Sequence, residues 1–412
     1  MTVHTVGTKS PTVFDAGLPA VVYEHAQNPD EAHRLIRQAR VQGPIALGPH
    51  GPEVLSYELV RTVLRDPRFC MPKGLVLAAQ GITSGRLWDK ATTGLLSLDG
   101  ADHHRLRRLV CKAFTPRSTT RLQTTIVNVI TELVDPVTVT GRCDVVADIT
   151  RRYPIPIICG LLGAPRCDWQ LFSDWAEDIF KIFHWNVAND APVIMAAFDE
   201  LDAYIDDMIA QRRRNLTDDL ISQLIRAEDD GDRLAADELV MLAEVLLMAG
   251  TDTTRNQLAA AVQVLCDHPQ QWALLAEHPE LAPQAVEELM RHSPVIFAAM
   301  RMAAEDVQLG GVTIPAGTLV LANIASANRD PAVYDDPDRL DITRANPPAM
   351  LGFGGGIHYC LGTHLARLEL AEALTVITRR MPNPHRAGPA SWKPIIGITG
   401  PTTLPIEFDP GH

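Results

Sequence analysis

The sequence predicts a mainly α protein with a minor β part. Helical periodicity of apolar residues dominates the middle of the chain and returns near its end, at residues 171–183, 192–214, 218–226, 234–266, 269–277, 281–292 and 363–379. Strand-like runs are short and lie near the two ends, at residues 45–55, 307–321 and 395–408. The β part is therefore expected to be small and assembled from distant segments.

Composition narrows the class of protein. The chain has 412 residues, and its 37 Lys plus Arg against 50 Asp plus Glu give a net charge of −13, which argues against binding to nucleic acid. Seven cysteines without a repeating spacing imply no disulfide framework. No apolar stretch approaches the ~18 residues of a membrane span, and no linker or repeat marks a boundary. We expect a cytoplasmic monomer in which residues 1–412 form a single domain.

The segment 234–266 is much longer than the mean helix of ~11 to 12 residues, so it should cross the molecule. Its apolar residues leave little polar surface on one half, as expected for a buried helix. In its middle stands AGTDTT, at residues 249–254. Glycine costs ~1 kcal/mol against alanine in a helix, and threonine is also a poor helix former. Two interpretations stay open: a local opening that presents a carboxylate and a hydroxyl to the interior, or a packed helix whose threonines bond their own backbone.

A glycine-rich string, FGGGIHYCLG, occupies residues 353–362 ahead of the last helical pattern. Its glycines let the backbone approach something flat or bulky. Cys360 stands just before a helix N-terminus, which favours the thiolate over the thiol. A thiolate there can be a nucleophile, a zinc ligand or an axial ligand of haem iron. Zinc is weakly supported, because Cys360, His358 and His364 lack a second paired motif, and an inert buried cysteine is the remaining alternative.

The string FGGGIHYCLG resembles the haem-binding loop of the cytochrome P450 family, FGxGxHxCxG, at every defined position. The resemblance implies the cytochrome P450 fold, in which a long central helix lies over a haem, with heme b as the cofactor. It implies Cys360 as the thiolate ligand of the iron, which favours O–O cleavage. It also implies that Phe353 packs near the sulfur, that His358 contacts a haem propionate and that Gly362 belongs to the cofactor-binding loop.

Further motifs follow the family's order along most of the chain. AGTDTT resembles the oxygen-activation motif, with Asp252 as the acid and Thr253 as the alcohol that manage proton delivery. His103 and Arg107 stand in a segment like HxRxRR, and Arg301 follows an SPV stretch. These last three residues match positions that anchor the haem propionates in the family.

Glu288 and Arg291 resemble the family's ExxR pair, and Arg339 occupies the position of the arginine that completes that triad. Taken alone, Glu288 and Arg291 would be an exposed i, i+3 pair that contributes ~0.2–0.5 kcal/mol. The resemblance instead implies a buried structural network behind the haem. We therefore interpret these three residues as folding residues and not as catalysts.

Residues 103–131 carry basic side chains and no acidic one, although the chain as a whole is acidic. Charges of one sign predict a patch that steers an acidic partner. By resemblance the patch lies near Cys360, where an iron–sulfur ferredoxin docks. The sequence shows no flavin or nicotinamide domain, so we expect electrons from a separate ferredoxin and ferredoxin reductase. The basic residues are Arg105, Arg107, Arg108, Lys112, Arg117 and Arg121.

The same motifs place a set of apolar residues around the expected substrate pocket, and segments 75–96 and 180–200 resemble the family's variable lid regions. An apolar lining predicts an apolar small-molecule substrate, whose identity the sequence does not choose. The expected pocket residues are Val245, Met248, Ala249, Phe297, Ala298 and Ile398.

These features predict a haem-thiolate monooxygenase that uses O2 and two electrons to hydroxylate an apolar small molecule. One alternative keeps the fold but makes the protein a peroxygenase or an oxidative coupling enzyme. Another is a non-catalytic haem-based ligand binder. The Asp252–Thr253 pair speaks against the use of peroxide, and the basic patch speaks against a ligand binder, which needs no electrons.

Overall fold

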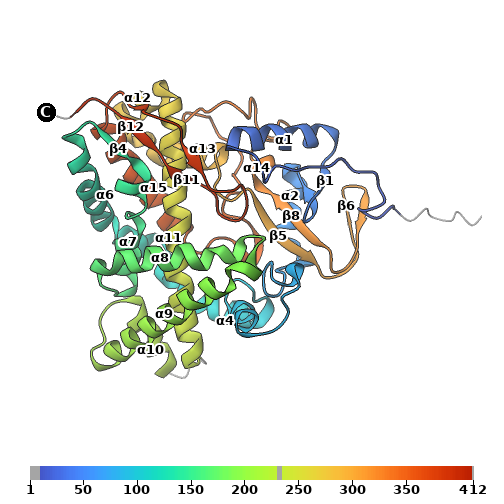
Figure 1. Ribbon diagram of the computed structural model, residues 1–412, viewed down its shortest axis with the longest axis horizontal. Helices are drawn as coiled ribbons and strands as arrows, with labels where there is room; N and C mark the ends of the chain where they lie inside the picture. Colours follow the sequence, from blue (N-terminus) through green and yellow to red (C-terminus); the bar gives the residue numbers. More distant parts are fainter. Residues whose placement is uncertain (1–9, 230–233, 411–412) are drawn as a thin grey trace, which may run out of the picture.

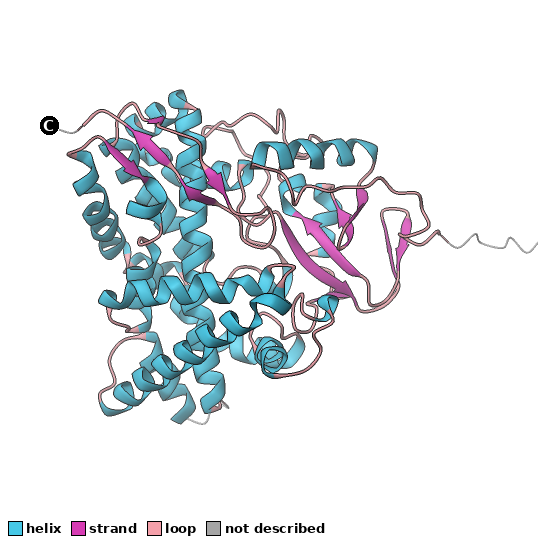
Figure 2. Ribbon diagram, viewed as in Figure 1, coloured by secondary structure: helices cyan, strands magenta, loops and turns pink. Residues whose placement is uncertain are grey.

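The computed structural model describes residues 10–229 and 234–410. This part of the chain is mostly helical with small sheets (Figure 2), so the predicted fold class is confirmed. The helices are α1 (Pro29–Gln42), α2 (Tyr57–Val63), α3 (Arg86–Thr93), α4 (Gly100–Cys111), α5 (Pro116–Thr120), α6 (Gln123–Thr138), α7 (Pro154–Leu162), α8 (Trp169–Ile179), α9 (Val187–Arg214), α10 (Leu220–Asp229), α11 (Ala236–Asp267), α12 (Pro269–Glu277), α13 (Ala282–His292), α14 (Ile324–Ala327) and α15 (Thr363–Arg380).

The largest sheet within the described residues has the strand order β1-β2-β8-β5-β3, with β2 and β8 parallel and the other neighbours antiparallel. It joins early strands to strands from the second half of the chain, as expected for a composite β part. The strands are β1 (Ile45–Gly48), β2 (Gly51–Val54), β3 (Phe69–Cys70), β4 (Arg142–Asp144), β5 (Ala298–Ala303), β6 (Val307–Leu309), β7 (Val312–Ile314), β8 (Leu319–Asn323), β9 (His385–Arg386), β10 (Ser391–Trp392), β11 (Pro401–Thr403) and β12 (Pro405–Glu407).

Figure 1 shows the five-stranded sheet with α1 and α2 on one side of the molecule and helices α6 to α12 with α15 on the other. The yellow helix α11 runs from one edge to the opposite edge, as its predicted length requires. Its 32 residues correspond to ~48 Å at 1.5 Å per residue. No helix within the described ranges is both long enough and apolar enough to cross a membrane.

The AGTDTT run does not interrupt α11, which is continuous from Ala236 to Asp267. Thr251 Oγ1 donates to the Leu247 carbonyl oxygen at 2.7 Å, and Thr253 Oγ1 donates to the Ala249 carbonyl oxygen at 3.0 Å. The structure therefore shows a packed helix without a local opening, in which Thr251 and Thr253 bond their own backbone and Thr254 bonds the Glu369 carboxyl.

Gly250 has a packing role within the same run. A Cβ at Gly250 would lie 3.0 Å from Ile158 Cδ1, so glycine lets α7 approach α11 closely.

The structure moves two predicted helix boundaries by about four residues or more and several others by less. The helix predicted over 171–183 ends at Ile179 and is followed by a 3-10 turn, Phe180–Phe183. The helix predicted to begin at Pro192 begins at Val187, and Pro192 lies inside it. Proline favours the first helical position, but here the helix continues through it.

Candidate active site

Cys360 lies in a tight loop between the 3-10 turn Gly356–His358 and the N-terminus of α15. Its backbone N–H donates to the Phe353 carbonyl oxygen at 2.9 Å, which closes the loop. Gly356 has a φ of +66°, and a Cβ there would lie 2.6 Å from the Leu64 carbonyl oxygen. Only glycine fits this position, so part of the glycine-rich string serves the turn and its packing.

Opposing effects act on the Cys360 thiol. Burial is the largest cause and raises its pKa above the usual value, and the hydrogen bond from the Gly362 backbone N–H and the charges of Arg107 and Arg367 offset only part of this rise. The Arg107 guanidinium donates to the carbonyl oxygen of Tyr359, directly before the cysteine. Among the described residues, no three His, Cys, Asp or Glu side chains are grouped so that they could hold a metal ion. The geometry thus gives the zinc interpretation of Cys360 no support.

A cavity of about 330 Å³, here called the inner cavity, lies between α11 and the Cys360 loop. Cys360 and Phe353 line it from the loop, Ala249 and Thr253 line it from α11, and Arg301 lines it from β5. Most of the remaining lining is apolar. The fold therefore brings the cysteine of one motif and the threonine of the other to the same cavity.

Asp252 does not line the inner cavity, although it precedes Thr253 directly, because adjacent residues of an α-helix point ~100° apart. The Asp252 carboxylate is buried, and its Oδ1 accepts a hydrogen bond from Arg255 Nε at 2.7 Å. Lys393 Nζ lies 3.4 Å from the same oxygen, and the Lys393 side chain is 26% exposed. The sequence analysis did not predict either partner, although the i, i+3 spacing of Asp252 and Arg255 could have indicated Arg255, whereas no spacing links Lys393 to Asp252.

The predicted propionate-binding residues separate into two groups. Arg301 and His358 line the inner cavity. Arg301 Nη1 donates to the Met300 carbonyl oxygen at 2.8 Å, and His358 Nε2 lies 2.8 Å from Asp99 Oδ1. Burial lowers the pKa of Arg301, and it also lowers the pKa of His358, which Asp99 partly offsets.

His103 and Arg107 form the second group and do not line the cavity. His103 is buried behind His358, with 4.6 Å between the ring centroids. Burial, together with the nearby His358 and Arg107, lowers the pKa of His103 to about 4. Its Nδ1 is buried without a hydrogen-bond partner. Buried polar atoms usually have a hydrogen-bond partner, so a bound group that supplies one would explain this exception.

Glu288 and Arg291 form the buried pair that the sequence predicted, with Nε to Oε2 at 2.7 Å and Nη2 to Oε1 at 2.8 Å. The prediction for Arg339 is wrong. Its side chain is 61% exposed and pairs with Asp336 and Asp341. Arg344 instead completes the triad with Glu288 and Arg291, because its Nε lies 3.3 Å from both Glu288 carboxylate oxygens.

The predicted substrate residues are distributed over two cavities that share lining residues. Ala298 and Ile398 line the inner cavity, whereas Val245 and Met248 line a second cavity of about 330 Å³, here called the outer cavity. Ala249 lines both. Residues of both predicted lid segments, Leu96, Phe180 and Phe183 among them, also line both.

The prediction for Phe297 is wrong. Its buried ring lies 5.1 Å from the His33 ring and 6.2 Å from the Tyr23 ring, between centroids, in a separate part of the core. Ala298 faces the inner cavity, and neighbouring residues of an extended chain point to opposite sides. Phe297 therefore faces away from the cavity.

The basic patch is smaller than predicted. Arg105 pairs with Glu238 of α11, with Nη1 to Oε2 at 3.0 Å, so it does not belong to a free basic surface. Arg107 is half-buried. The exposed remainder, here called the basic surface, consists of Arg108, Lys112, Arg117 and Arg121.

The Cys360 loop adds apolar groups beside this surface. Its Ile357 and Tyr359 side chains are 40% and 39% exposed. The turn Lys112–Phe114 and α5, which carry part of the basic surface, pack against α15, which begins just after the loop. Exposed apolar and basic groups therefore lie near the end of the molecule that holds Cys360.

Comparisons with known proteins agree with this geometry. The chain matches the family model described as Cytochrome P450 over residues 76–381. Mycinamicin IV hydroxylase/epoxidase of Micromonospora griseorubida is 41% identical over 369 residues, which are 87% of this chain and 91% of that protein. Luteothin monooxygenase of Streptomyces thioluteus is 38% identical over 377 residues, 90% of this chain and 92% of that protein. The crystal structure of CalO2 superposes with a TM-score of 0.89 at 30% identity and covers 96% of this chain and 100% of that one.

Proposed function

Because the chain belongs to the cytochrome P450 family of monooxygenases, we propose that it is a haem-thiolate enzyme that hydroxylates an apolar small molecule. We further propose that O2 is the oxidant and that a ferredoxin and its reductase supply two electrons. The observation that carries this proposal is that Cys360 and Thr253 line one inner cavity. A thiolate ligand favours O–O cleavage in this reaction, and a hydroxyl that positions protons assists it.

The inner cavity suits heme b. Its mainly apolar lining suits the faces of a porphyrin, and the orphaned Nδ1 of His103 suits a polar group that completes its surroundings. Cys360 would ligate the iron, and Arg301, His358 and His103 would hold the propionates. Arg107 would stabilise the thiolate through its charge, since it lowers the pKa of Cys360. When bound, the haem supplies the iron at which O2 is reduced and from which one oxygen atom passes to the substrate.

Asp252 and Thr253 divide the handling of protons in this proposal. Lys393 is partly exposed and touches Asp252 Oδ1, so protons from solvent reach the buried carboxylate along this side chain. The Thr253 hydroxyl lines the inner cavity, donates to Ala249 and keeps lone pairs that accept a further hydrogen bond. Thr253 Oγ1 thereby orients a proton donor inside the cavity, while Asp252 renews the proton supply from outside it.

The basic surface supports docking of an acidic ferredoxin. Its exposed charges contrast with the net charge of −13, and the apolar Ile357 and Tyr359 beside it supply the contact area that charges alone do not. Electrons delivered there arrive near Cys360. This face is therefore the one we propose for the redox partner.

Two relatives support oxygen insertion over the alternatives. One is named a hydroxylase/epoxidase and the other a monooxygenase, and both cover most of this chain. By this likeness we favour oxygen insertion over oxidative coupling or ligand binding without turnover. The apolar lining of both cavities favours a substrate that is largely apolar.

The test starts from the spectrum of the reduced, carbon monoxide-bound protein. The wild type should show the band typical of thiolate ligation, and Cys360→His should move it to the imidazole-ligated position. Cys167→Ser changes an exposed cysteine and should leave the band in place. A thiolate band in Cys360→His would reject the assigned ligand.

The second step measures turnover. A compound that shifts the Soret band should consume NADH with ferredoxin and reductase and take up labelled oxygen from O2. Product formed with peroxide but never with NADH would instead favour a peroxygenase.

A further inference from the structure

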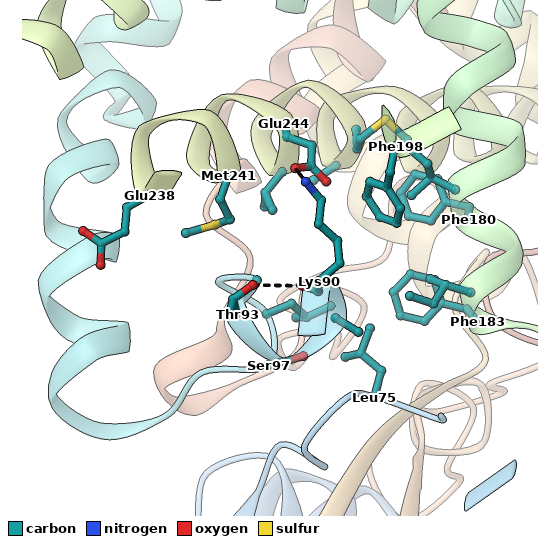
Figure 3. A pocket seen from close by; sticks show the side chains of 18 of the residues that line it. Leu75, Lys90, Thr93, Ser97, Phe180, Phe183, Phe198, Glu238, Met241 and Glu244 are labelled. Atoms are coloured by element: carbon teal, nitrogen blue, oxygen red, sulfur yellow. Dashed lines mark hydrogen bonds and ion pairs between the residues drawn. The ribbon is translucent and has the colours of Figure 1, made fainter. Parts of the chain in front are cut away.

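The outer cavity holds a charge cluster inside an otherwise apolar lining. Lys90 of α3 and Glu244 of α11 line it, and Asp202 of α9 completes the cluster from behind. Figure 3 shows Lys90 reaching toward Glu244, with Phe180 and Phe198 beside them. The lids therefore meet α11 at a group of charged side chains that the proposed oxygenation chemistry does not use.

Lys90 lies between two carboxylates. Its Nζ lies 2.7 Å from both Asp202 carboxylate oxygens and 2.9 Å from Glu244 Oε2. An ammonium has no acceptor, and the contacts with Asp202 are hydrogen bonds. Both carboxylates thus compete with an anionic ligand for Lys90.

Glu244, by contrast, has a buried carboxylate oxygen without a hydrogen-bond partner. It is 4% exposed, and its carboxyl group lies beside the Asp202 carboxyl and 2.9 Å from Lys90 Nζ. The contact with Lys90 is not aligned as a hydrogen bond at Oε2, which is buried and has no hydrogen-bond partner. The cluster holds two carboxylates and one ammonium, so it lacks a positive charge. Burial, the largest cause, and the neighbouring Asp202 raise the pKa of Glu244 to about 7, although Lys90 opposes the shift.

The other carboxylates of the lining do not compete for this role. Glu238 points away from Lys90 in Figure 3 and pairs with Arg105. Asp237 is exposed. The aromatic rings, by contrast, suit a cation: Lys90 Nζ already lies 5.2 Å from the centroid of the Phe198 ring.

We propose that Glu244 binds a cationic group of the substrate, such as a protonated or quaternary amine, in the outer cavity, which shares lining residues with the inner cavity. The apolar remainder of the molecule then extends along α11 past Met248 and Ala249 toward Thr253. The rise from Glu244 to Thr253 is ~13 Å along the helix axis, which is the least length that such a substrate needs. This inference rests on the proposed function, because it names the substrate class of the same site.

The experiment compares three probes with the same decyl chain: decyltrimethylammonium, 1-decanol and decanoate. The quaternary nitrogen has no lone pair, so it cannot ligate iron. Dissociation constants are measured on the haem-loaded protein by calorimetry and by the Soret shift. Decyltrimethylammonium should bind roughly tenfold or more tightly than decanol, as expected for a charge-assisted contact.

Three variants locate the site. Glu244→Gln should bring the ratio of the two affinities close to one, whereas Glu238→Gln, which changes the carboxylate that points away, should keep the wild-type ratio. Lys90→Met should increase the preference for the cation, because it leaves two carboxylates without a partner. If Glu244→Gln does not fold, Glu244→Asp keeps the charge on a shorter side chain that reaches less far into the outer cavity. It should lower the ratio of the affinities for decyltrimethylammonium and decanol.

Each outcome has a clear meaning. A preference for decanoate that disappears in Lys90→Met would show that Lys90 anchors an anion and would overturn the proposal. An unchanged cation preference in Glu244→Gln would overturn it as well. Equal affinities with an intact thiolate band reject this site alone, whereas loss of the thiolate band with a retained cation preference rejects the oxygenation proposal alone.

Discussion

Lys393 Nζ lies 3.4 Å from Asp252 Oδ1, although 141 residues separate them in the chain. Lys393 follows β10, while Asp252 lies in the middle of the buried helix α11. Arg255 holds the same carboxylate from one turn further along the helix. Lys393 is the partly exposed member of this group, so it links the buried acid to the surface.

We expect Lys393→Met to slow substrate turnover roughly tenfold, which corresponds to ~1.4 kcal/mol in the barrier. Proton supply to Asp252 would lose its link to solvent, so the solvent isotope effect on turnover should rise. Substrate affinity and the carbon monoxide spectrum should not change. Lys181→Met, which removes a lysine paired with Asp178, is the control. Equal turnover in both variants would remove Lys393 from the proton route.

Thr253→Ala should separate NADH oxidation from product formation. The variant removes the hydroxyl that lines the inner cavity, so substrate should still bind and electrons should still arrive. The ratio of product to NADH consumed should fall roughly tenfold or more, and added peroxide should restore part of the product. Thr375→Ala removes the same kind of bond, from a threonine to a carbonyl one turn earlier, in α15. It should remain coupled, and full coupling in Thr253→Ala would contradict the assigned role.

Arg344→Met should destabilise the protein by ~1.5–3 kcal/mol, the usual contribution of hydrogen bonds to a charged group, because Glu288 loses one partner but keeps Arg291. Arg344 reaches Glu288 and also donates to the Asp335 carbonyl oxygen at 2.6 Å. Arg339→Met changes an exposed side chain and should cost within ~0.5 kcal/mol. Thermal or denaturant unfolding of the two variants makes the comparison. The reverse order would restore the assignment made from the sequence.

Charge reversal on the basic surface should slow reduction by ferredoxin. For Arg108→Glu and Lys112→Glu we expect roughly tenfold slower reduction at low salt. The salt dependence should flatten, because exposed charges are screened beyond ~10 Å at 0.1 M. Arg34→Glu on α1, which Figure 1 shows beside the five-stranded sheet, is the matched control. Identical reduction rates in all three variants would place the docking face elsewhere.

His33 predicts a pH dependence of stability. Burial, followed by the charge of Arg329, holds the pKa of His33 well below 6.5 in the folded state. The unfolded chain has a histidine pKa of ~6.5, so below this pH it binds a proton that the folded protein does not. Stability therefore falls as the pH drops below ~6.5, by at most ~1.4 kcal/mol per pH unit for one group.

The variant His33→Leu should remove this contribution to the free energy of unfolding. Because Nε2 has no hydrogen-bond partner, stability near pH 7 should stay within ~1 kcal/mol of the wild type. Denaturant unfolding at several pH values measures the slope. His278→Leu, at an exposed position, should keep the wild-type slope. An equal slope in His33→Leu would show that other groups carry the acid sensitivity.

Several features of this protein follow from short stretches of its sequence alone. The Cys360 loop requires glycines at set positions, the long apolar pattern requires a long buried helix, and Glu288 and Arg291 meet because they are three residues apart in a helix. The apolar periodicity did not predict helix α6 (Gln123–Thr138). This helix contains many threonines, valines and isoleucines, which are also common in strands.

The tertiary structure alone decided which distant side chains meet. Arg344, and not Arg339, contacts Glu288. The Phe297 ring packs against His33 in a separate part of the core. Arg105 pairs with Glu238. The tertiary structure also joins Lys393 to Asp252 and Lys90 to Glu244. Such pairs bring together residues from different elements, and their contacts depend on how helices and turns pack. No periodicity or spacing along the chain records that packing.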